Sequence, residues 1–187
     1  MKILQKIIIV LIFISVFGCS IQSKQYNFIS NALSNKNIDG PTPNWIIDWL
    51  GTKIRVFAIN SENQIFFANY DDYFLVFDGR QIIEAIGFLP QKNVIKIEAN
   101  DNNLTYMLNK KILATDLCES WSVSIDEKTN FILHEQICYA AETDYNYTNL
   151  IFINNKSQII ALKYKMHPDY PPIQLTMDES PQLDLDR

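Results

Sequence analysis

The sequence predicts a mainly β protein whose antiparallel sheets form a sandwich or an open, curled barrel, with a short helix near the N-terminus. Two features of the chain favour this class. Apolar and polar residues alternate in short runs over much of the sequence after residue 50, and alternation from one residue to the next is typical of half-buried strands. Turn-forming residues separate these runs at regular intervals, as they do in antiparallel sandwiches and barrels.

The first 18 residues have the layout of an export signal. Lys2 and Lys6 form a basic start, residues 7–17 are apolar, and Gly18 directly precedes Cys19. A membrane span needs about 20 consecutive apolar residues, so this run is too short to cross a bilayer. An ordinary secretory signal is the remaining alternative, but such signals usually end in a small-x-small cleavage pattern, which the sequence lacks here.

The segment Val16-Phe17-Gly18-Cys19 resembles the lipobox of bacterial lipoproteins. The resemblance implies that the mature chain begins at Cys19 and carries a diacylglycerol thioether there, usually with a further acyl chain such as palmitate on the amine. Several chains anchor a protein firmly, whereas one chain alone holds it only marginally. Ser20 follows the cysteine in place of Asp, which resembles outer-membrane cargo. We therefore expect a lipid-anchored protein of the outer membrane that faces the periplasm.

Composition indicates one globular domain and opposes a nucleic-acid partner. The chain after the signal is long enough for one core, and 48% of the 187 residues are hydrophobic. The formal net charge is −5, and phosphate binding depends on clustered lysines and arginines. Lys110-Lys111, and Lys163 with Lys165, come nearest to a basic patch, and we interpret both as solvated surface.

Four segments are expected along the chain. Residues 1–18 form the signal peptide, and residues 19–43 form a lipidated N-terminus with a short helix and a linker. Residues 44–178 form the antiparallel β domain. Residues 179–187 carry Asp and Pro with little periodicity, so we expect a loosely ordered tail.

The helix is predicted near the start of the second segment. Ser23 can cap a run in which Tyr26, Ile29 and Leu33 share one face. Residues 35–43 are rich in turn-forming residues and should link this helix to the sheet domain.

The strands of the β domain are predicted from alternating residues and from the turns between them. Asp78-Gly79 is a turn dipeptide and predicts a hairpin, whereas residues 100–103 are most simply a loop. Residues 154–157 predict another hairpin, and Pro171-Pro172 precedes a strand at the sheet edge, because proline cannot donate to a ladder. The strands predicted in this way cover residues 53–59, 64–69, 73–77, 80–86, 94–99, 150–153, 158–166 and 173–177.

Two further strands flank a turn at residues 127–130. Apolar residues alternate with polar ones through residues 120–126 and again through residues 131–139. A turn centred in this loop sets Ile125 against Phe131, so that the apolar faces of the two strands coincide. A slip by one residue would turn apolar side chains outward.

The same register places Cys118 opposite Cys138. Directly opposed residues of antiparallel strands lie close enough for a disulfide. Because Cys19 is consumed by lipid, these two remain as an even pair in an oxidising compartment. We expect a disulfide between them, with two buried free thiols as the alternative. The register also sets Ser122 opposite His134, which we interpret as a cross-strand polar pair rather than a nucleophile and its base.

Residues with catalytic or metal-binding chemistry are few. His134 and His167 lack a second ligand at metal spacing, so we expect no metal and no cofactor. Asp71-Asp72 suggest acid–base work on sugars, but they fall between two predicted strands, where aspartate commonly makes turns. Three tryptophans offer surfaces for sugar stacking, and we expect most of them in the core: Trp45, Trp49 and Trp121.

Two stretches of the β domain carry a distinctive order of residues. Residues 74–83 (FLVFDGRQII) place a glycine turn before a basic residue and an apolar strand, which ends near Gly87-Phe88-Leu89. Residues 151–160 lead to Tyr170-Pro171-Pro172-Ile173, and Trp121 lies in a predicted strand. These features resemble a hairpin, a closing Tyr-Pro-Pro-Val segment and a strand tryptophan of the YjbF/GfcB family. Its members are lipoproteins associated with group 4 capsule and other exopolysaccharide operons.

The resemblance implies a non-catalytic accessory in capsule or exopolysaccharide export or assembly. Its partners would be polysaccharide or proteins of the export machinery, and the lipid anchor would attach it to the membrane. If the resemblance holds, a partner should contact exposed aromatics or the sheet edge at Tyr170, Pro171, Pro172 and Ile173.

Two alternatives from other classes stay open. The first is an envelope glycan hydrolase that uses Asp71, Asp72 or Glu84. The second is a lipid or lipoprotein carrier, whose curled sheet would enclose a cavity lined by apolar side chains.

Overall fold

All strands of the described residues belong to one antiparallel sheet. The computed structural model describes residues 44–61, 63–90, 93–100, 102–141, 145–178, 180, 183 and 185. The chain divides into two units, Met1–Pro41 and Thr42–Arg187, and the described residues belong to the second. The strands are β1 (Trp45–Trp49), β2 (Thr52–Ser61), β3 (Gln64–Ala68), β4 (Phe74–Phe77), β5 (Ile82–Ile86), β6 (Val94–Asn100), β7 (Asn103–Leu108), β8 (Lys111–Cys118), β9 (Ser122–Asp126), β10 (Phe131–Tyr139), β11 (Asn146–Ile153), β12 (Ile159–Tyr164) and β13 (Ile173–Met177).

The described part of the chain contains strands and turns but no α-helix. The helix predicted after Ser23 and the lipidation predicted at Cys19 both fall outside the described residues. No described segment forms a helix with the length and hydropathy that crossing a bilayer requires.

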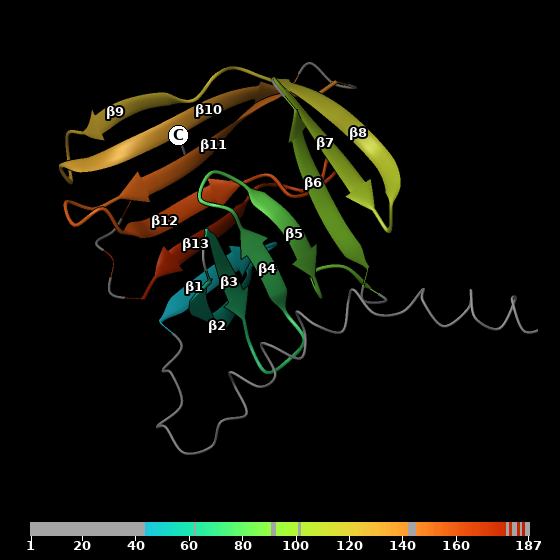
Figure 1. The fold of residues 1–187 in the computed structure, drawn as a ribbon, viewed down its shortest axis with the longest axis horizontal. Helices are drawn as coiled ribbons and strands as arrows, with labels where there is room; N and C mark the ends of the chain where they lie inside the picture. The colour runs from blue at the N-terminus through green and yellow to red at the C-terminus, as the bar shows by residue number, and fades with distance from the viewer. Residues whose placement is uncertain are drawn as a thin grey trace, which may run out of the picture. The chain divides into compact units, whose positions relative to one another are not determined.

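Twelve strands of the described region form a closed ring (Figure 1). Strands β1 to β8 pair in chain order, as do β10 to β13. The pairing of β1 with β13 and the pairing of β8 with β10 complete the ring. β9 pairs with β10 beside the end of β8 and lies outside the ring. The predicted sandwich or open, curled barrel is therefore wrong, because the two ends of one sheet meet and close it into an antiparallel barrel.

β13 shows why the sheet closes. Its two prolines come before the strand, so every residue from Ile173 to Met177 keeps its backbone N–H. The strand pairs with β12 on one side and with β1 on the other, where Leu175 lies opposite Ile47. The predicted edge position of residues 173–177 is therefore wrong. Closure leaves β1 and β13 without the unpaired backbone groups of a sheet edge.

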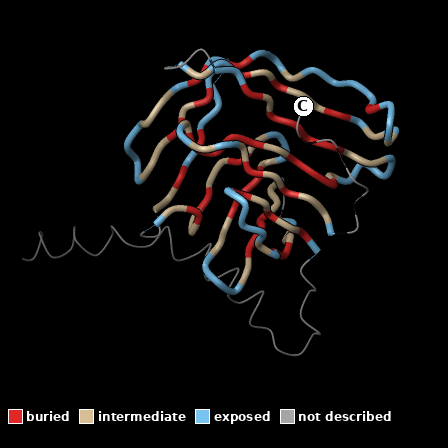
Figure 2. The backbone as a smooth tube through the Cα atoms, turned by 180° about the vertical axis from the view of Figure 1, so that it is seen from behind, coloured by how far each residue is buried: buried red, intermediate tan, exposed pale blue. Residues whose placement is uncertain are grey.

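Large aromatic side chains fill the inside of the barrel. Tyr106, Tyr164, Phe67 and Phe77 are fully buried, and Figure 2 shows buried positions along the strands and exposed ones at the turns. A ring of about eight strands is just filled by ordinary side chains, and a larger ring encloses more space. Bulky rings supply the extra volume here, and burial of each one contributes about 2–3 kcal/mol.

A second apolar cluster covers the outside of the barrel at β11. Tyr147 and Ile151 belong to the inner core, whereas Leu150 and Phe152 belong to the outer cluster. This outer cluster consists of Leu133, Leu150, Phe152, Ile160, Ala161 and Leu185. Leu185 thus attaches the C-terminal segment to the sheet, and β11 is buried on both faces.

The hairpin of β9 and β10 has a register one residue away from the predicted one. The pairing of Ile125 with Phe131 is wrong, since Ile125 lies opposite Ile132. The turn sets the register, because the Asp126 carboxylate accepts hydrogen bonds from the N–H and the hydroxyl of Thr129, at 3.0 and 2.6 Å. Turn chemistry therefore overrides the alternation of apolar residues.

The shifted register changes which side chains the hairpin exposes. Val123 and Ile125 are 62% and 64% exposed, which is the expected outcome of a one-residue slip. His134 lies opposite Val123, so the predicted pairing of Ser122 with His134 is wrong. β9 therefore presents an apolar face that no other described residue covers.

The structure contains the predicted disulfide between Cys118 and Cys138. The two residues lie opposite each other where β8 meets β10, with their Cα atoms 4.0 Å apart. The chain takes four steps from Cys118 to Ser122, while the facing strand takes three from Cys138 to Glu135. Residues 119–121, which lie between the two strands, accommodate the extra residue. We call the pairing of β8 with β10 the seam.

Candidate functional site

Aromatic side chains from separate parts of the chain meet at the end of the barrel where β1, β3, β5 and β12 finish. We define the aromatic end cluster as Trp49, Tyr73, Phe88, His167 and Tyr170. The ring of Trp49 lies 5.6 Å from that of Phe88 and 5.5 Å from that of Tyr170, between centroids. Phe88 also lies 5.4 Å from Tyr73, and Tyr170 lies 4.8 Å from His167. The rings therefore form one continuous row.

Gly87 positions Phe88 in this row. Its φ is +87°, and a Cβ added there would lie 2.5 Å from the backbone oxygen of Asp72. Glycine permits this close approach between the β5–β6 loop and the β3–β4 loop. The approach brings Phe88 edge-on against Tyr73.

The predicted binding segment Tyr170-Pro171-Pro172-Ile173 runs along the aromatic end cluster. Trp49 Nε1 donates a hydrogen bond of 3.1 Å to the carbonyl oxygen of Pro171, and the ring of Tyr170 packs edge-on against Trp49. Pro171 is exposed, Tyr170 and Pro172 are half-buried, and Ile173 is fully buried in the core. The segment can therefore present Tyr170 and both prolines to a partner, but not Ile173.

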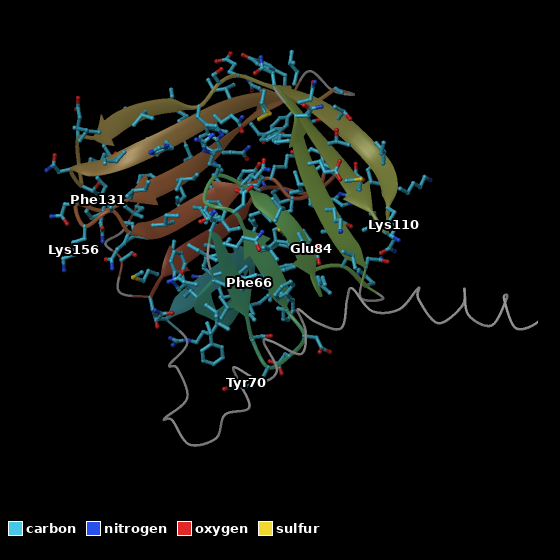
Figure 3. All side chains as sticks on the ribbon, viewed as in Figure 1. Phe66, Tyr70, Glu84, Lys110, Phe131 and Lys156 are labelled. Atoms are coloured by element: carbon cyan, nitrogen blue, oxygen red, sulfur yellow. A yellow bond between two sulfur atoms is a disulfide. The ribbon has the colours of Figure 1, made fainter. Side chains whose placement is uncertain are left out.

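The carboxylates considered for glycan cleavage lie on different elements. Asp71 and Asp72 are exposed in the loop between β3 and β4, and the backbone of Asp72 adopts a φ of 74°. Glu84, labelled in Figure 3, lies on β5 and forms an ion pair of 3.6 Å with Lys96 of β6. The two aspartates therefore lie in a turn, and Glu84 is paired with a residue of the neighbouring strand.

A buried polar network lies beside the seam. The Asp116 carboxylate accepts hydrogen bonds from the Tyr147 hydroxyl at 2.9 Å and from the Ala141 N–H at 3.3 Å. The hydroxyl of Tyr147 also hydrogen-bonds that of Tyr106. Burial raises the pKa of Tyr106 and the pKa of Tyr147, so both hydroxyls stay protonated at neutral pH. The network thereby links β7, β8 and β11.

Lys165 lies next to this network, in the segment between β12 and β13. The residue is only 3% exposed. Its Nζ lies 4.5 Å from the centre of the Tyr147 ring and 5.2 Å from that of Tyr145. Burial lowers the pKa of Lys165, and the nearby Asp116 carboxylate opposes this shift. The Lys165 backbone N–H donates a 3.0 Å hydrogen bond to Asn149 Oδ1, which holds the segment against β11.

Sequence reasoning missed this network. The interpretation of Lys165 as solvated surface is wrong, because the residue is buried. Asp116 and Tyr147 lie 31 residues apart in the chain, so no local pattern joins them. One signal was present: Asp116 stands between the apolar residues of β8, and an acidic residue in such a strand is rarely buried without a partner.

The barrel is similar to a solved structure. It matches that of the hypothetical lipoprotein YmcC from Escherichia coli (K12) with a TM-score of 0.52 and 10% sequence identity. The match covers 84% of this chain and 96% of that chain. No family model matches the sequence, and no curated protein matches it. At this identity the likeness shows that the two chains share a fold.

Proposed function

We propose that this protein is a lipid-anchored envelope protein and a non-catalytic accessory in the export or assembly of capsule or another exopolysaccharide. One observation carries the proposal: the barrel shares its fold with the hypothetical lipoprotein YmcC over 96% of that protein's chain. The lipobox-like sequence that ends at Cys19 supports the anchor. The Tyr170-Pro171-Pro172-Ile173 segment, which resembles the YjbF/GfcB family, supports the link to exopolysaccharide.

The expected location is the periplasmic face of the outer membrane. Lipid on Cys19 would hold the chain there, because several acyl chains bind a bilayer firmly. Ser20 in place of Asp supports the outer membrane. The disulfide between Cys118 and Cys138 supports an oxidising compartment.

The aromatic end cluster supports a binding role. Its rings hold one another in fixed positions, and the Trp49 hydrogen bond to Pro171 attaches the binding segment to them. Tyr73 and Tyr170 are half-buried, so each leaves part of a ring uncovered. Aromatic surfaces of this kind bind through their apolar faces and keep a polar tip in water. Polysaccharide or an export-machinery protein is therefore the partner that we assign to this end of the barrel.

Lipidation is tested by labelling with a palmitate analogue in a Gram-negative host. Full-length wild-type chain should be labelled, shortened by signal cleavage and recovered in the detergent phase. Cys19→Ala removes the acceptor thiol and should abolish all three, whereas Cys118→Ala is the matched cysteine control and should keep the label. A Cys19→Ala chain that is still labelled and still partitions into detergent would overturn the anchor.

The export role is tested by deleting the gene in the native organism and measuring polymer on the cell surface. The deletion should lower surface polymer, and wild-type chain should restore it. Cys19→Ala at equal expression should not, because the chain would lack its anchor. Unchanged surface polymer in the deletion strain would refute the export role and leave the anchoring result intact.

A further inference from the structure

Within the described sheet, β9 is the strand that has a neighbour on one side only (Figure 1). That neighbour is β10, and the backbone N–H and C=O groups on the other side of β9 face no described strand. Proteins usually protect such an edge with charges, prolines, bulges or a covering segment, because it readily pairs with a further strand. The first four residues of β9, Ser122 to Ile125, are uncharged, exposed and regular in register. This edge therefore lacks the usual protection.

The edge of β8 near the seam provides the contrast. Only Leu117 and Cys118 of β8 pair with β10, so the earlier residues of β8 have no ladder on that side. The strand begins with the exposed Lys111, and its register against β7 shifts close to that end. A lysine and a register shift both hinder the addition of another strand. β9 is therefore the edge that favours it.

The side chains along the β9 edge are apolar on one face of the sheet. Ile125 lies opposite Ile132 of β10, which in turn lies opposite Ile153 of β11. Directly opposed residues share a face, so the three isoleucines form a row across three strands. Ile125 and Ile132 are 64% and 39% exposed, and Val123 on the same face is 62% exposed. A strand added at β9 would cover apolar side chains as well as backbone groups.

We propose that β9 pairs with β9 of a second copy of this chain, antiparallel and around a two-fold axis at Ser124. In this register Val123 of each copy lies opposite Ile125 of the other. Ser122 of each copy lies opposite Asp126 of the other. All five residues of the strand are then paired, and the apolar face continues from one copy into the next.

The residue pattern of β9 matches a copy of itself in charge and in shape. A slip by one residue would set the apolar face of one copy beside the serine face of the other, so the register around Ser124 is preferred. Asp126 is the one charged residue of the strand. It lies opposite a serine and about four residues, or roughly 13 Å, along the strands from Asp126 of the other copy. No like charges are therefore opposed.

Two-fold pairing also limits the assembly to two chains. The same edge is used on both copies, so the contact closes on itself and leaves no unprotected strand for a third copy. A five-residue strand contributes less than the roughly 1,600 Å² of a typical stable interface. The dimer should therefore be reversible, with a dissociation constant on the order of 10–100 µM.

Disulfide trapping of the full-length chain in detergent tests the register. Ser124→Cys places two thiols directly opposite each other, where Cα atoms lie about 4.5–5.5 Å apart, within reach of a disulfide. Ser122→Cys is the matched control, because its two thiols lie roughly 13 Å apart along the strands. Under mild oxidation Ser124→Cys should form a covalent dimer on a non-reducing gel, and Ser122→Cys should stay monomeric.

Sedimentation of the full-length chain in density-matched detergent tests the contribution of the apolar face. Val123→Lys introduces a charge at the edge in both copies at once and should weaken dimerisation by about tenfold or more. Ile112→Lys is the matched control, because Ile112 on β8 is as exposed as Val123, and it should leave the dimer unchanged. Both side chains are exposed, so both variants should keep the circular dichroism of the wild-type chain.

Four results would overturn the inference. A wild-type chain that stays monomeric up to about 1 mM would leave a strand of another protein as the occupant of β9. Equal trapping of Ser122→Cys and Ser124→Cys would contradict the antiparallel register. Unchanged dimerisation of Val123→Lys, or equal weakening by Ile112→Lys, would place the contact elsewhere. The dimer depends on β9 and not on the export role, so each can fail while the other holds.

Discussion

Two junctions complete the ring of described strands, and they are held in different ways. Where β13 meets β1, the register runs from Trp45 opposite Met177 to Asp48 opposite Gln174. Buried side chains of both strands, including those of Trp45 and Leu175, belong to the inner core. This junction therefore combines a long ladder of hydrogen bonds with apolar burial.

The seam has a much shorter ladder. β8 and β10 pair at Cys118 with Cys138 and at Leu117 with Tyr139, and the disulfide joins the first pair. The network of Asp116 and its tyrosine partners adds polar links across the same place. In this barrel, a long, buried ladder closes the sheet without covalent help, whereas a short ladder is accompanied by a cross-link and a buried polar network.

The largest expected effect comes from breaking the junction of β1 with β13. Trp45→Ala removes a buried ring that packs edge-on against Phe67, with centroids 5.0 Å apart. We expect a loss of about 3–5 kcal/mol in the free energy of unfolding, since neighbouring side chains refill such a cavity only in part. Urea unfolding followed by circular dichroism measures it.

The matched control for Trp45→Ala is an exposed apolar residue. Ile112→Ala on β8 removes an exposed side chain and should change stability by no more than about 0.5 kcal/mol. A Trp45→Ala loss as small as that of Ile112→Ala would show that this junction does not depend on apolar burial.

Removing the cross-link at the seam should have the next largest effect. The double variant Cys118→Ala with Cys138→Ala frees a loop whose ends lie 20 residues apart, and we expect a loss of about 3 kcal/mol. Hydrogen exchange should become faster in β8, β9 and the facing part of β10, and should stay unchanged in β1 and β13. Equal acceleration in all of these strands would contradict the division into two separately held junctions.

Local alternation in the sequence predicts strands whose side chains keep one face inward throughout. It predicts β13 at its own bounds and β3 to within one residue. Alternation misses β8, because apolar and polar side chains do not alternate through residues 111–118. The pairing of β8 with β7 is also irregular, since its register shifts between Tyr106 and Met107. Alternation also misses β1, because Ile46 adds an apolar residue between the buried Trp45 and Ile47.

Contacts between distant parts of the chain mostly leave no local signal. The hydrogen bond from Trp49 to Pro171 spans 122 residues. The alternation of residues 173–177 likewise does not indicate that this strand pairs with β1. The cysteines are the exception, because two residues of one reactive type identify each other as partners. Their pairing is predictable even though turn chemistry at Asp126 shifts the hairpin register by one residue.

The smallest expected effect concerns the polar links at the seam. Tyr147→Phe removes the hydroxyl that donates to Asp116 at 2.9 Å and leaves a buried carboxylate with one donor fewer. We expect a loss of about 1–3 kcal/mol at neutral pH. Tyr139→Phe is the matched control, because its hydroxyl donates to Glu119 at the surface, and it should cost much less than Tyr147→Phe.

The pH dependence of stability separates the Tyr147 hydroxyl from a simple loss of packing. Burial raises the pKa of Tyr147 in the folded chain, whereas a tyrosine in the unfolded chain ionises near pH 10. Above about pH 10 the folded state therefore binds more protons than the unfolded state, and stability falls as pH rises. Tyr147→Phe should remove part of this alkaline fall, and Tyr139→Phe should remove less of it. If the free energy of unfolding fell equally steeply with rising pH in wild-type and Tyr147→Phe chains, ionisation of the Tyr147 hydroxyl would not contribute to the alkaline loss of stability.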